Sequence, residues 1–377
     1  MEVPDPGWGG RGSGEVHDSD SAVHDRGQTH TGGKGSGRGE KLGHGERNKA
    51  TTNQSRARQS ESKKKKRKKK KSKKKWTDVE ILVFGLSLVG FESSRQQVRE
   101  ELNIRRFRSH YGVGPKAIEA LIKDLNPIDS GKAWSDKEIH KLFIGICWLK
   151  LYKTEEVMAG RWDLGEDTCR NTAKMYATQI QTLKELKITF RGMNPNLKWL
   201  SVDGVHFHSS EMRTDPNSKW WSHKFNGPGF AYEVALDMVM DVARWTNGPK
   251  PAGIHDLTFL RGGTLKEGKQ KWDKTALYFH VPKGVRLCGD SGYNGQDDLI
   301  STTDSAHVGE TKELFARFKS RQETYNTRLK FFGVLAQTFR HGKNGLTEKM
   351  KLHQTCFDAV CVLVAYDMEN GHGLFEV

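Results

Sequence analysis

In the stretch Trp199-Leu200-Ser201-Val202-Asp203-Gly204-Val205-His206-Phe207, mainly apolar residues surround one acid near the centre. This pattern is the first evidence for the fold class. Its valine and aromatic residues favour a β-strand. An ionised carboxylate inside a strand is costly unless other groups offset its charge. Asp203 therefore predicts a functional site in the middle of a strand.

Further strands are predicted downstream of this one. They run from Ala231 to Asp241, from about Arg244 to Asn247, and from Gly284 to Asp290, where a glycine-bearing turn begins. The segment Gly253-Ile254-His255-Asp256 leads into a short helix. This alternation of short strands and helices predicts an α/β domain over residues 193–377.

A long helix is predicted from about Glu310 to Gln337. Lys319, Glu323, Asn326 and Lys330 fall on one face of it, at positions i, i+4, i+7 and i+11. Carboxylates held by a sheet and a helix suit Mg²⁺, which prefers a few hard oxygen ligands and keeps positions for water and phosphate. Spacing alone makes this site only suggestive, since most acids of the chain are expected to be surface charges.

The region from Trp76 to about residue 192 has helical periodicity. Ser135 and Glu138 form a capping-box pattern at the start of one helix. A helix from about Thr154 to Trp162, a turn at residues 163–165 and a helix from Asp167 to about Leu186 resemble a helix-turn-helix. The second helix would present four residues of types that contact bases or phosphates: Thr168, Arg170, Asn171 and Lys174. Plain helical packing is the alternative interpretation of this corner.

Residues 1–75 form a distinct basic tail. They hold 21 Lys and Arg against 9 Asp and Glu, of 62 and 46 in the whole chain, and few large aliphatic residues. Such a segment cannot bury enough apolar surface to fold, so it is expected to be disordered. The basic block from Lys63 to Lys75 predicts nuclear import together with non-specific phosphate binding. The alternative is a tail that increases solubility and carries no targeting signal.

The composition argues against membrane and secreted proteins. No apolar run approaches the roughly 20 residues that cross a bilayer, and the start of the chain has no apolar segment of the signal-peptide kind. The 5 cysteines are scattered and odd in number, which fits reduced, buried thiols rather than disulfides or a zinc site.

Four motifs occur together in one order: Val202-Asp203-Gly204-Val205-His206, Gly253-Ile254-His255-Asp256, Gly289-Asp290-Ser291-Gly292-Tyr293, and the stretch from Arg321 to Lys330. Together they resemble the catalytic domain of a DDE transposase of the Harbinger-type branch. The resemblance spans about Leu197 to Val377, and the end of the chain is similar to transposase-derived proteins of eukaryotic algae.

The resemblance implies an RNase H-like fold with Asp203, Asp290 and Glu323 as catalytic triad and metal ligands. It implies Mg²⁺ as cofactor, as two ions, with Mn²⁺ as a substitute. Asp256 matches a further acidic position with a supporting role, and Asn326 lies on the same helix face as the glutamate. Lys319 and Lys330 match basic positions that hold phosphates. Lys319 stands where Arg is usual, which loses a bidentate phosphate contact.

The function implied is cutting and joining of DNA strands by two-metal phosphoryl transfer, without a covalent protein–DNA intermediate. DNA is the expected partner, beside a second copy of the chain in a homodimer or higher oligomer, and a Myb-like DNA-binding partner in some members of the branch. Lys224, with Trp220 and Trp221, is a candidate for lining a DNA groove. His206, His208 and His255 are expected to be structural.

Two alternatives remain beside a transposase of the nucleus. One is a domesticated descendant that binds DNA without cleaving it, and the other is a nuclease without strand transfer. The expected domain organisation is a disordered tail over residues 1–75, a helical DNA-binding domain over 76–192 and a catalytic domain over 193–377.

Overall fold

A computed structural model describes residues 75–92, 99–127, 133–194, 196, 198–240, 242–302, 309–342 and 345–375. The predicted basic tail lies outside the described residues, apart from Lys75. Contacts divide the chain into one unit over Met1–Lys69 and a second over Lys70–Val377, and the fold below is that of the second unit.

The first part of this unit is helical, as the periodicity predicts. Its helices are α2 (Asp78–Leu88), α4 (Glu100–Tyr111), α5 (Pro115–Asp124), α6 (Asp136–Leu151), α7 (Glu155–Trp162), α8 (Glu166–Gln181) and α9 (Lys184–Lys187). The capping box predicted for α6 is present, because the Ser135 side chain accepts from the Glu138 amide and the Glu138 side chain accepts from the Ser135 amide. The helix predicted to end at Leu186 is divided into α8 and α9 by residues 182 and 183.

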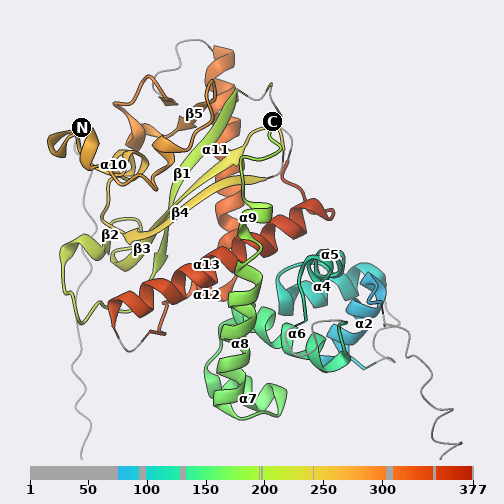
Figure 1. The fold of residues 1–377 in the computed structure, drawn as a ribbon. Coiled ribbons are helices and arrows are strands. Elements are labelled where there is room, and N and C mark those ends of the chain that lie inside the picture. Colours follow the sequence, from blue (N-terminus) through green and yellow to red (C-terminus); the bar gives the residue numbers. More distant parts are fainter. Residues whose placement is uncertain are drawn as a thin grey trace, which may run out of the picture. The chain divides into compact units, whose positions relative to one another are not determined.

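The second part is built on one mixed sheet. Its strands are β1 (Trp199–His208), β2 (Trp221–Ser222), β3 (Gly227–Asp237), β4 (Ala243–Pro251), β5 (Arg286–Gly289) and β6 (Ile300–Thr302). β3 pairs antiparallel with β1, β2 and β4, whereas β5 pairs parallel with β1 and β6 pairs parallel with β5. The order β2-β3-β1-β5-β6, with β4 also on β3, makes β1 a central strand (Figure 1). The chain is thus a mixed helix-and-sheet protein, in keeping with the α/β expectation.

Helices cover both faces of this sheet. They are α10 (Asp256–Arg261), α11 (Gly309–Lys330), α12 (Gly333–Ala336) and α13 (Leu346–Glu369), beside short 3₁₀ turns at Ser218–Trp220, Leu265–Glu267, Lys269–Lys271, Leu277–Phe279 and Ser291–Tyr293. Along β1, Val205 and Phe207 join the core that holds α13, whereas Leu200 and Val202 join the core beside α10. Because side chains alternate along a strand, odd-numbered β1 residues face α11 and α13, and even-numbered ones face α10.

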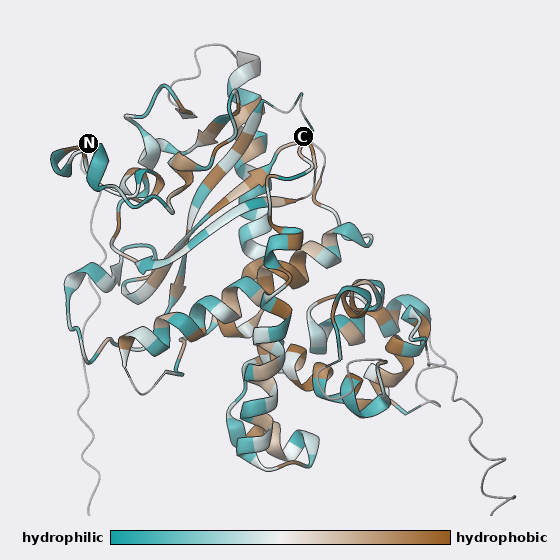
Figure 2. Cartoon of the chain, viewed as in Figure 1, coloured by the Kyte–Doolittle hydropathy of each residue, from teal (hydrophilic) through white to brown (hydrophobic). Residues whose placement is uncertain are grey.

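Helix α13 is the main packing partner of the unit. Residues 355–368 are buried without interruption, so the helix is covered on all sides. Its hydrophobic residues stand out in brown in Figure 2. One core cluster joins residues of α5, α6 and α8 to α13 and to β1 and β3. All five cysteines are free and buried, as expected. No helix among the described residues is long and apolar enough to cross a membrane.

Candidate active site

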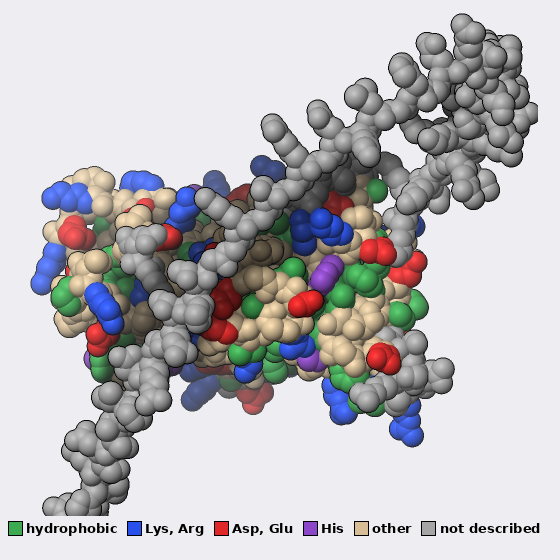
Figure 3. Space-filling view, turned by 90° about the horizontal axis from the view of Figure 1, so that it is seen from below, with side chains coloured by type: hydrophobic (Ala, Val, Ile, Leu, Met, Phe, Trp, Pro, Cys, Tyr) green, Lys and Arg blue, Asp and Glu red, His purple; other side chains and the backbone are tan. Residues whose placement is uncertain are grey.

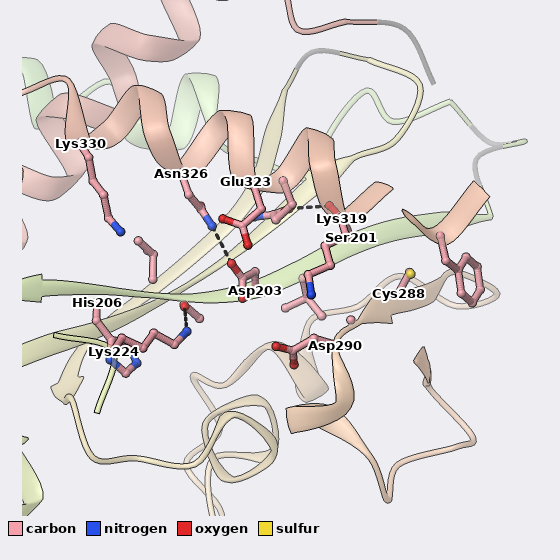
Figure 4. Close-up of a pocket in the computed structure, with 16 residues that line it drawn as sticks. Ser201, Asp203, His206, Lys224, Cys288, Asp290, Lys319, Glu323, Asn326 and Lys330 are labelled. Atoms are coloured by element: carbon pink, nitrogen blue, oxygen red, sulfur yellow. Dashed lines mark hydrogen bonds between the residues drawn. The ribbon is translucent and has the colours of Figure 1, made fainter. Parts of the chain in front are cut away.

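Asp203 lies in the middle of β1, on the face that α11 covers. Its Oδ2 accepts a hydrogen bond of 2.6 Å from Nδ2 of Asn326 on α11. The last residue of β1 paired with β5 is Ser201, opposite Cys288, so β1 continues beyond the end of β5. The β1 edge beyond Ser201 is therefore not covered by β5, and a pocket opens there (Figure 4).

Asp290 directly follows β5. Continuing the parallel register by two residues places it across from Asp203, because Ser201 pairs with Cys288. Its Oδ1 accepts from the Gly292 amide at 2.9 Å and so caps the turn Ser291–Tyr293. The acid predicted at a strand end is therefore held at the edge where the pocket lies.

Helix α11 supplies the opposite wall. The four residues predicted on one helix face, Lys319, Glu323, Asn326 and Lys330, line the same pocket as Asp203 and Asp290. Figure 4 shows their side chains directed from α11 toward β1. The pocket has a volume of about 270 Å³. The structure thus gathers the three predicted catalytic carboxylates and three of the four supporting side chains.

Two buried contacts hold α11 against the sheet, and no pattern in the sequence predicts either of them. The Ser201 hydroxyl donates to Oε1 of Gln322, and Nη1 of Arg321 donates to the Met238 carbonyl at 2.7 Å. Gln322 is 2% exposed and Ser201 3%. Polar pairs so deeply buried are specific, since either partner alone would be unsatisfied. These two contacts fix the position of Glu323 along and above β1.

Lys224 comes from the turn between β2 and β3 and enters the pocket. Its Nζ donates to the Gly204 carbonyl at 2.7 Å. That carbonyl lies on β1 beyond the residues that pair with β5. The lysine predicted to contact DNA in a groove is therefore placed in the wall of the carboxylate pocket itself. Of its predicted neighbours, Trp220 is buried and Trp221 is 46% exposed.

Asp256 begins α10 and lies on the other face of β1. A Cβ atom on Gly204 would lie 2.5 Å from Asp256 Oδ1, and one on Gly292 would lie 2.7 Å from Asp256 Oδ2. Only glycine leaves this space, so Gly204 and Gly292 make room for the Asp256 carboxylate beside Asp203 and Asp290. Asp256 itself does not line the pocket.

Burial and neighbouring carboxylates raise the pKa of Asp203 and of Asp256. Burial raises the pKa of Asp203 to about 6, and the charges of Glu323, Asp290 and Asp256 add to the rise, against the opposing charge of Lys224. Burial also raises the pKa of Asp256, with Asp290 adding to it and Lys224 opposing. Such crowding of like charges makes this pocket a candidate functional site.

Glu233 is a buried acid that the sequence did not reveal. It pairs with Gly204 across β1 and β3, so it shares the face of Asp256. Its exposure is 0%, and burial raises its pKa well above the usual value, which keeps the carboxyl protonated. Tyr293 donates to Oε1 at 3.5 Å, and Oε2 has no partner among the described residues. Only the strand register, which sequence alone does not fix, brings it here.

His206 and His208 both make contacts within the fold, and His206 also lines the pocket. Nδ1 of His206 lies 2.8 Å from the Ser222 hydroxyl, and burial lowers its pKa to about 4, so the ring is neutral. The His208 ring stacks on Phe225 with centroids 3.6 Å apart.

The donor set of the pocket fits a hard divalent cation. Asp203, Asp290 and Glu323 offer carboxylate oxygens, and the buried Oδ1 of Asn326 accepts from no described residue. Within the described ranges, no three His, Cys, Asp or Glu side chains already lie close enough to form a metal site. A cation bound in the pocket would be held by these carboxylates and would offset their mutual repulsion.

The candidate DNA-reading corner has mixed features. Thr168 and Asn171 are exposed on the first turns of α8, while Lys174 is half-buried. The Arg170 guanidinium pairs with Glu155 of α7, which joins α7 to α8, and with Asp167 of its own helix. Thr168 and Asn171 are therefore the two of the four predicted residues that are freely presented.

Comparison with known proteins adds no further guide. The chain matches no protein-family model, no curated protein and no solved structure.

Proposed function

We propose that the chain is a metal-dependent DNA endonuclease and transposase of the DDE superfamily, Harbinger-type branch. The observation that carries this proposal is the pocket that Asp203 from β1, Asp290 after β5 and Glu323 from α11 line together with three lysines. Carboxylates alone would repel a phosphodiester. A pocket that pairs acids with lysines suits a substrate that is itself anionic and is processed with a bound cation.

The sheet supports an RNase H-like fold for residues 193–377. An antiparallel unit of β4, β3 and β1 is extended by β5 and β6, which run parallel to β1. This order puts Asp203 on the central strand and Asp290 on its parallel neighbour, the arrangement that the resemblance implies. The preceding helices would serve as the DNA-binding part, with the α7–α8 corner as its helix-turn-helix.

Asp203, Asp290 and Glu323 would hold the Mg²⁺ or Mn²⁺ ions. Bound there, such ions activate water or a 3′-hydroxyl as nucleophile and stabilise the leaving oxygen. Asn326 orients Asp203 through its 2.6 Å hydrogen bond. Lys319, Lys330 and Lys224 line the same pocket and would contact phosphate oxygens.

The side chains of the pocket also favour a reaction without a covalent intermediate. The Ser201 hydroxyl is used in its bond to Gln322. Burial raises the pKa of the Cys288 thiol to about 12, so it is not a thiolate at neutral pH. Neither group is prepared as a nucleophile, which leaves water or a DNA hydroxyl.

Nicking of supercoiled plasmid in Mn²⁺ tests the proposal. We expect the wild type to nick and Asp203→Asn and Glu323→Gln to lose nicking by at least about 100-fold, since each removes a cation ligand. Asp297→Asn, which neutralises an exposed acid, is the matched control and should nick normally. Equal nicking by all four proteins would sink the triad assignment.

A second readout does not depend on activity. Mn²⁺ should raise the melting temperature of the wild type, because a ligand of the folded state stabilises it, and should not raise that of Asp203→Asn. Metal binding without nicking would favour the domesticated DNA-binding alternative. Nicking without joining of DNA ends would favour the nuclease alternative.

Assembly and location belong to the same proposal. Joining two DNA ends calls for a homodimer or higher oligomer, with or without a Myb-like partner, and action in the nucleus. A fluorescent fusion that lacks residues 63–75 should lose its nuclear concentration, and unchanged concentration would refute the role of that block.

A further inference from the structure

The segment between α10 and β5, residues 262–286, carries a marked positive charge, and we call it the basic segment. It holds six basic residues against two acids: Lys266, Lys269, Lys271, Lys274, Lys283 and Arg286 against Glu267 and Asp273. Residues 76–377 carry an excess of four positive charges, and the basic segment alone carries the same excess. The rest of that region is therefore neutral on balance.

The lysines of the basic segment are exposed and lack acidic partners. All five are exposed, and none pairs with a carboxylate of the described residues. Asp273 pairs outside the segment, with Lys250 of β4 at 2.8 Å. Glu267 accepts from the Thr264 amide at 3.0 Å, and the charge of Lys271 also acts on it without a direct ion pair. Lys and Arg side chains gather at the left end of Figure 3, the end at which α10 lies in Figure 1.

Aromatic rings hold part of this charge in place. Nζ of Lys274 lies 4.0 Å from the centroid of the Phe279 ring, and Nζ of Lys269 lies 5.8 Å from that of Trp272. Trp272 is buried and its Nε1 donates to the Thr264 carbonyl at 2.9 Å. The backbone that carries the lysines is therefore anchored, and less freedom is lost when an anion binds.

The basic segment joins two acids of the candidate active site. It follows α10, which begins with Asp256, and it ends at Arg286, the first residue of β5. Since a strand rises about 3.3 Å per residue, the start of β5 lies roughly 13 Å from Asp290. At about 3.4 Å per base pair, that is roughly four base pairs along a DNA duplex.

We propose that the basic segment binds the phosphate backbone of duplex DNA beside the reaction centre, independently of base sequence. This inference rests on the proposed function, and it adds a surface that the four motifs do not contain. Unpaired ammonium groups on a fixed backbone suit a regular row of phosphates. The resulting contact would hold DNA within a few base pairs of the carboxylate pocket.

The salt dependence of DNA binding by the full chain tests this surface. The variant Lys266→Gln/Lys271→Gln/Lys283→Gln removes the three lysines for which no ring contact is found. The matched control, Lys198→Gln/Arg213→Gln/Lys351→Gln, removes three exposed basic residues that lie outside the proposed DNA-binding helices, the pocket and the basic segment. Both keep the basic tail, so differences between them report on the basic segment.

Binding to a labelled duplex of arbitrary sequence is followed from about 50 to about 200 mM salt. Each phosphate contact contributes about 0.9 to the slope of log K against log salt, so we expect the first variant to be shallower by about 2 to 3. The control should keep the wild-type slope. Equal slopes for the two variants, with equal melting temperatures, would overturn the proposal.

The outcome is separable from that of the proposed function. A shallower slope in a protein that never nicks DNA would support the surface and count against the catalytic proposal. Nicking by the wild type together with equal slopes would support the catalytic proposal and count against the surface.

Discussion

Asp203 lies in a crowded electrostatic environment, since burial and three neighbouring carboxylates raise its pKa to about 6. The folded state therefore binds a proton more tightly than the unfolded chain does. The stability that this proton contributes is fully present below about pH 4 and is lost as the pH rises through about 6. The acid that would hold the cation thus destabilises the cation-free protein at neutral pH.

Replacing Asp203 by Asn should stabilise the protein in the presence of a chelator at pH 8. The gain should reach at most about 3 kcal/mol, because a rise of about two pKa units corresponds to that free energy. Near pH 4 most of the gain should be lost, since Asp203 is then protonated in the folded state and about half protonated in the unfolded chain. Urea denaturation of the two proteins at both pH values measures this.

Asp297→Asn serves as control, and it should show no such pH-dependent gain because Asp297 is exposed. Absence of any gain for Asp203→Asn at pH 8 would contradict the crowding of carboxylates.

Among single residues, the sequence predicts those that belong to one motif or that share one face of a helix. Glu323, Asn326 and the two lysines on α11 share a face by spacing alone, and the structure places all four at the pocket. Glu233 could not be predicted, because its place opposite Gly204 depends on the register between β1 and β3. The approach of Asp256 to Gly204 and Gly292 is likewise a contact between segments distant in sequence.

Among the elements, the position of α11 determines whether Glu323 reaches the sheet. Its joint with β1 is the buried Ser201–Gln322 pair. Ser201→Ala or Gln322→Met alone leaves one buried polar group unsatisfied and should cost about 1–3 kcal/mol of the free energy of unfolding. The double variant should cost clearly less than the sum of the two.

A double-mutant cycle in urea measures the coupling between these side chains. Strict additivity would show that the two side chains do not act as a pair.

The α7–α8 corner makes a separate prediction. If side chains of α8 contact bases, the wild-type protein should enrich a sequence motif from a pool of random DNA duplexes. The variant Thr168→Ala/Asn171→Ala should enrich a less specific motif or none. Each lost pair of base contacts is worth about 1–3 kcal/mol of discrimination. Thr178→Ala, an exposed position further along α8, is the control. Enrichment of the same motif by both variants would favour the packing interpretation of the corner.

Element boundaries show where sequence reasoning stops. The helix predicted from Glu310 to Gln337 ends at Lys330, because the next residues meet the end of α6: Lys150 Nζ donates to the Phe331 carbonyl at 2.6 Å. A Cβ on Gly333 would lie 2.9 Å from the Lys150 carbonyl oxygen. Strand β3 begins at Gly227 rather than Ala231, since its Gly-Pro-Gly start, which looks like a turn, pairs with β2. Both differences arise from tertiary contacts that local pattern does not contain.

In the molecule as a whole, helices and sheet share one core through α13. Asp367 near the end of α13 accepts from both Arg108 nitrogens, at 2.6 and 2.8 Å, and from the Gly114 amide at 2.8 Å. We therefore expect residues 75–375 to unfold in a single transition, with circular dichroism and tryptophan fluorescence changing together.

Asp367→Ala should lower the free energy of unfolding by about 3–5 kcal/mol, because it leaves a partly buried Arg108 without its partner. Glu369→Gln, which breaks the more exposed pair with Lys187, should cost at most about 1 kcal/mol. Two separate transitions, of which Asp367→Ala shifts only one, would show that helices and sheet are independent domains.

The burial of α13 bears on how copies of such a gene decay. Every acid of the pocket precedes Leu346 in the chain, yet the core that holds β1 and α11 is completed by α13. A frameshift or stop codon shortly before Leu346 would leave the three carboxylate codons untouched while removing the support of the sheet. An intact triad in a damaged copy is therefore no sign of a working enzyme, and the codons for α13 are the better place to look.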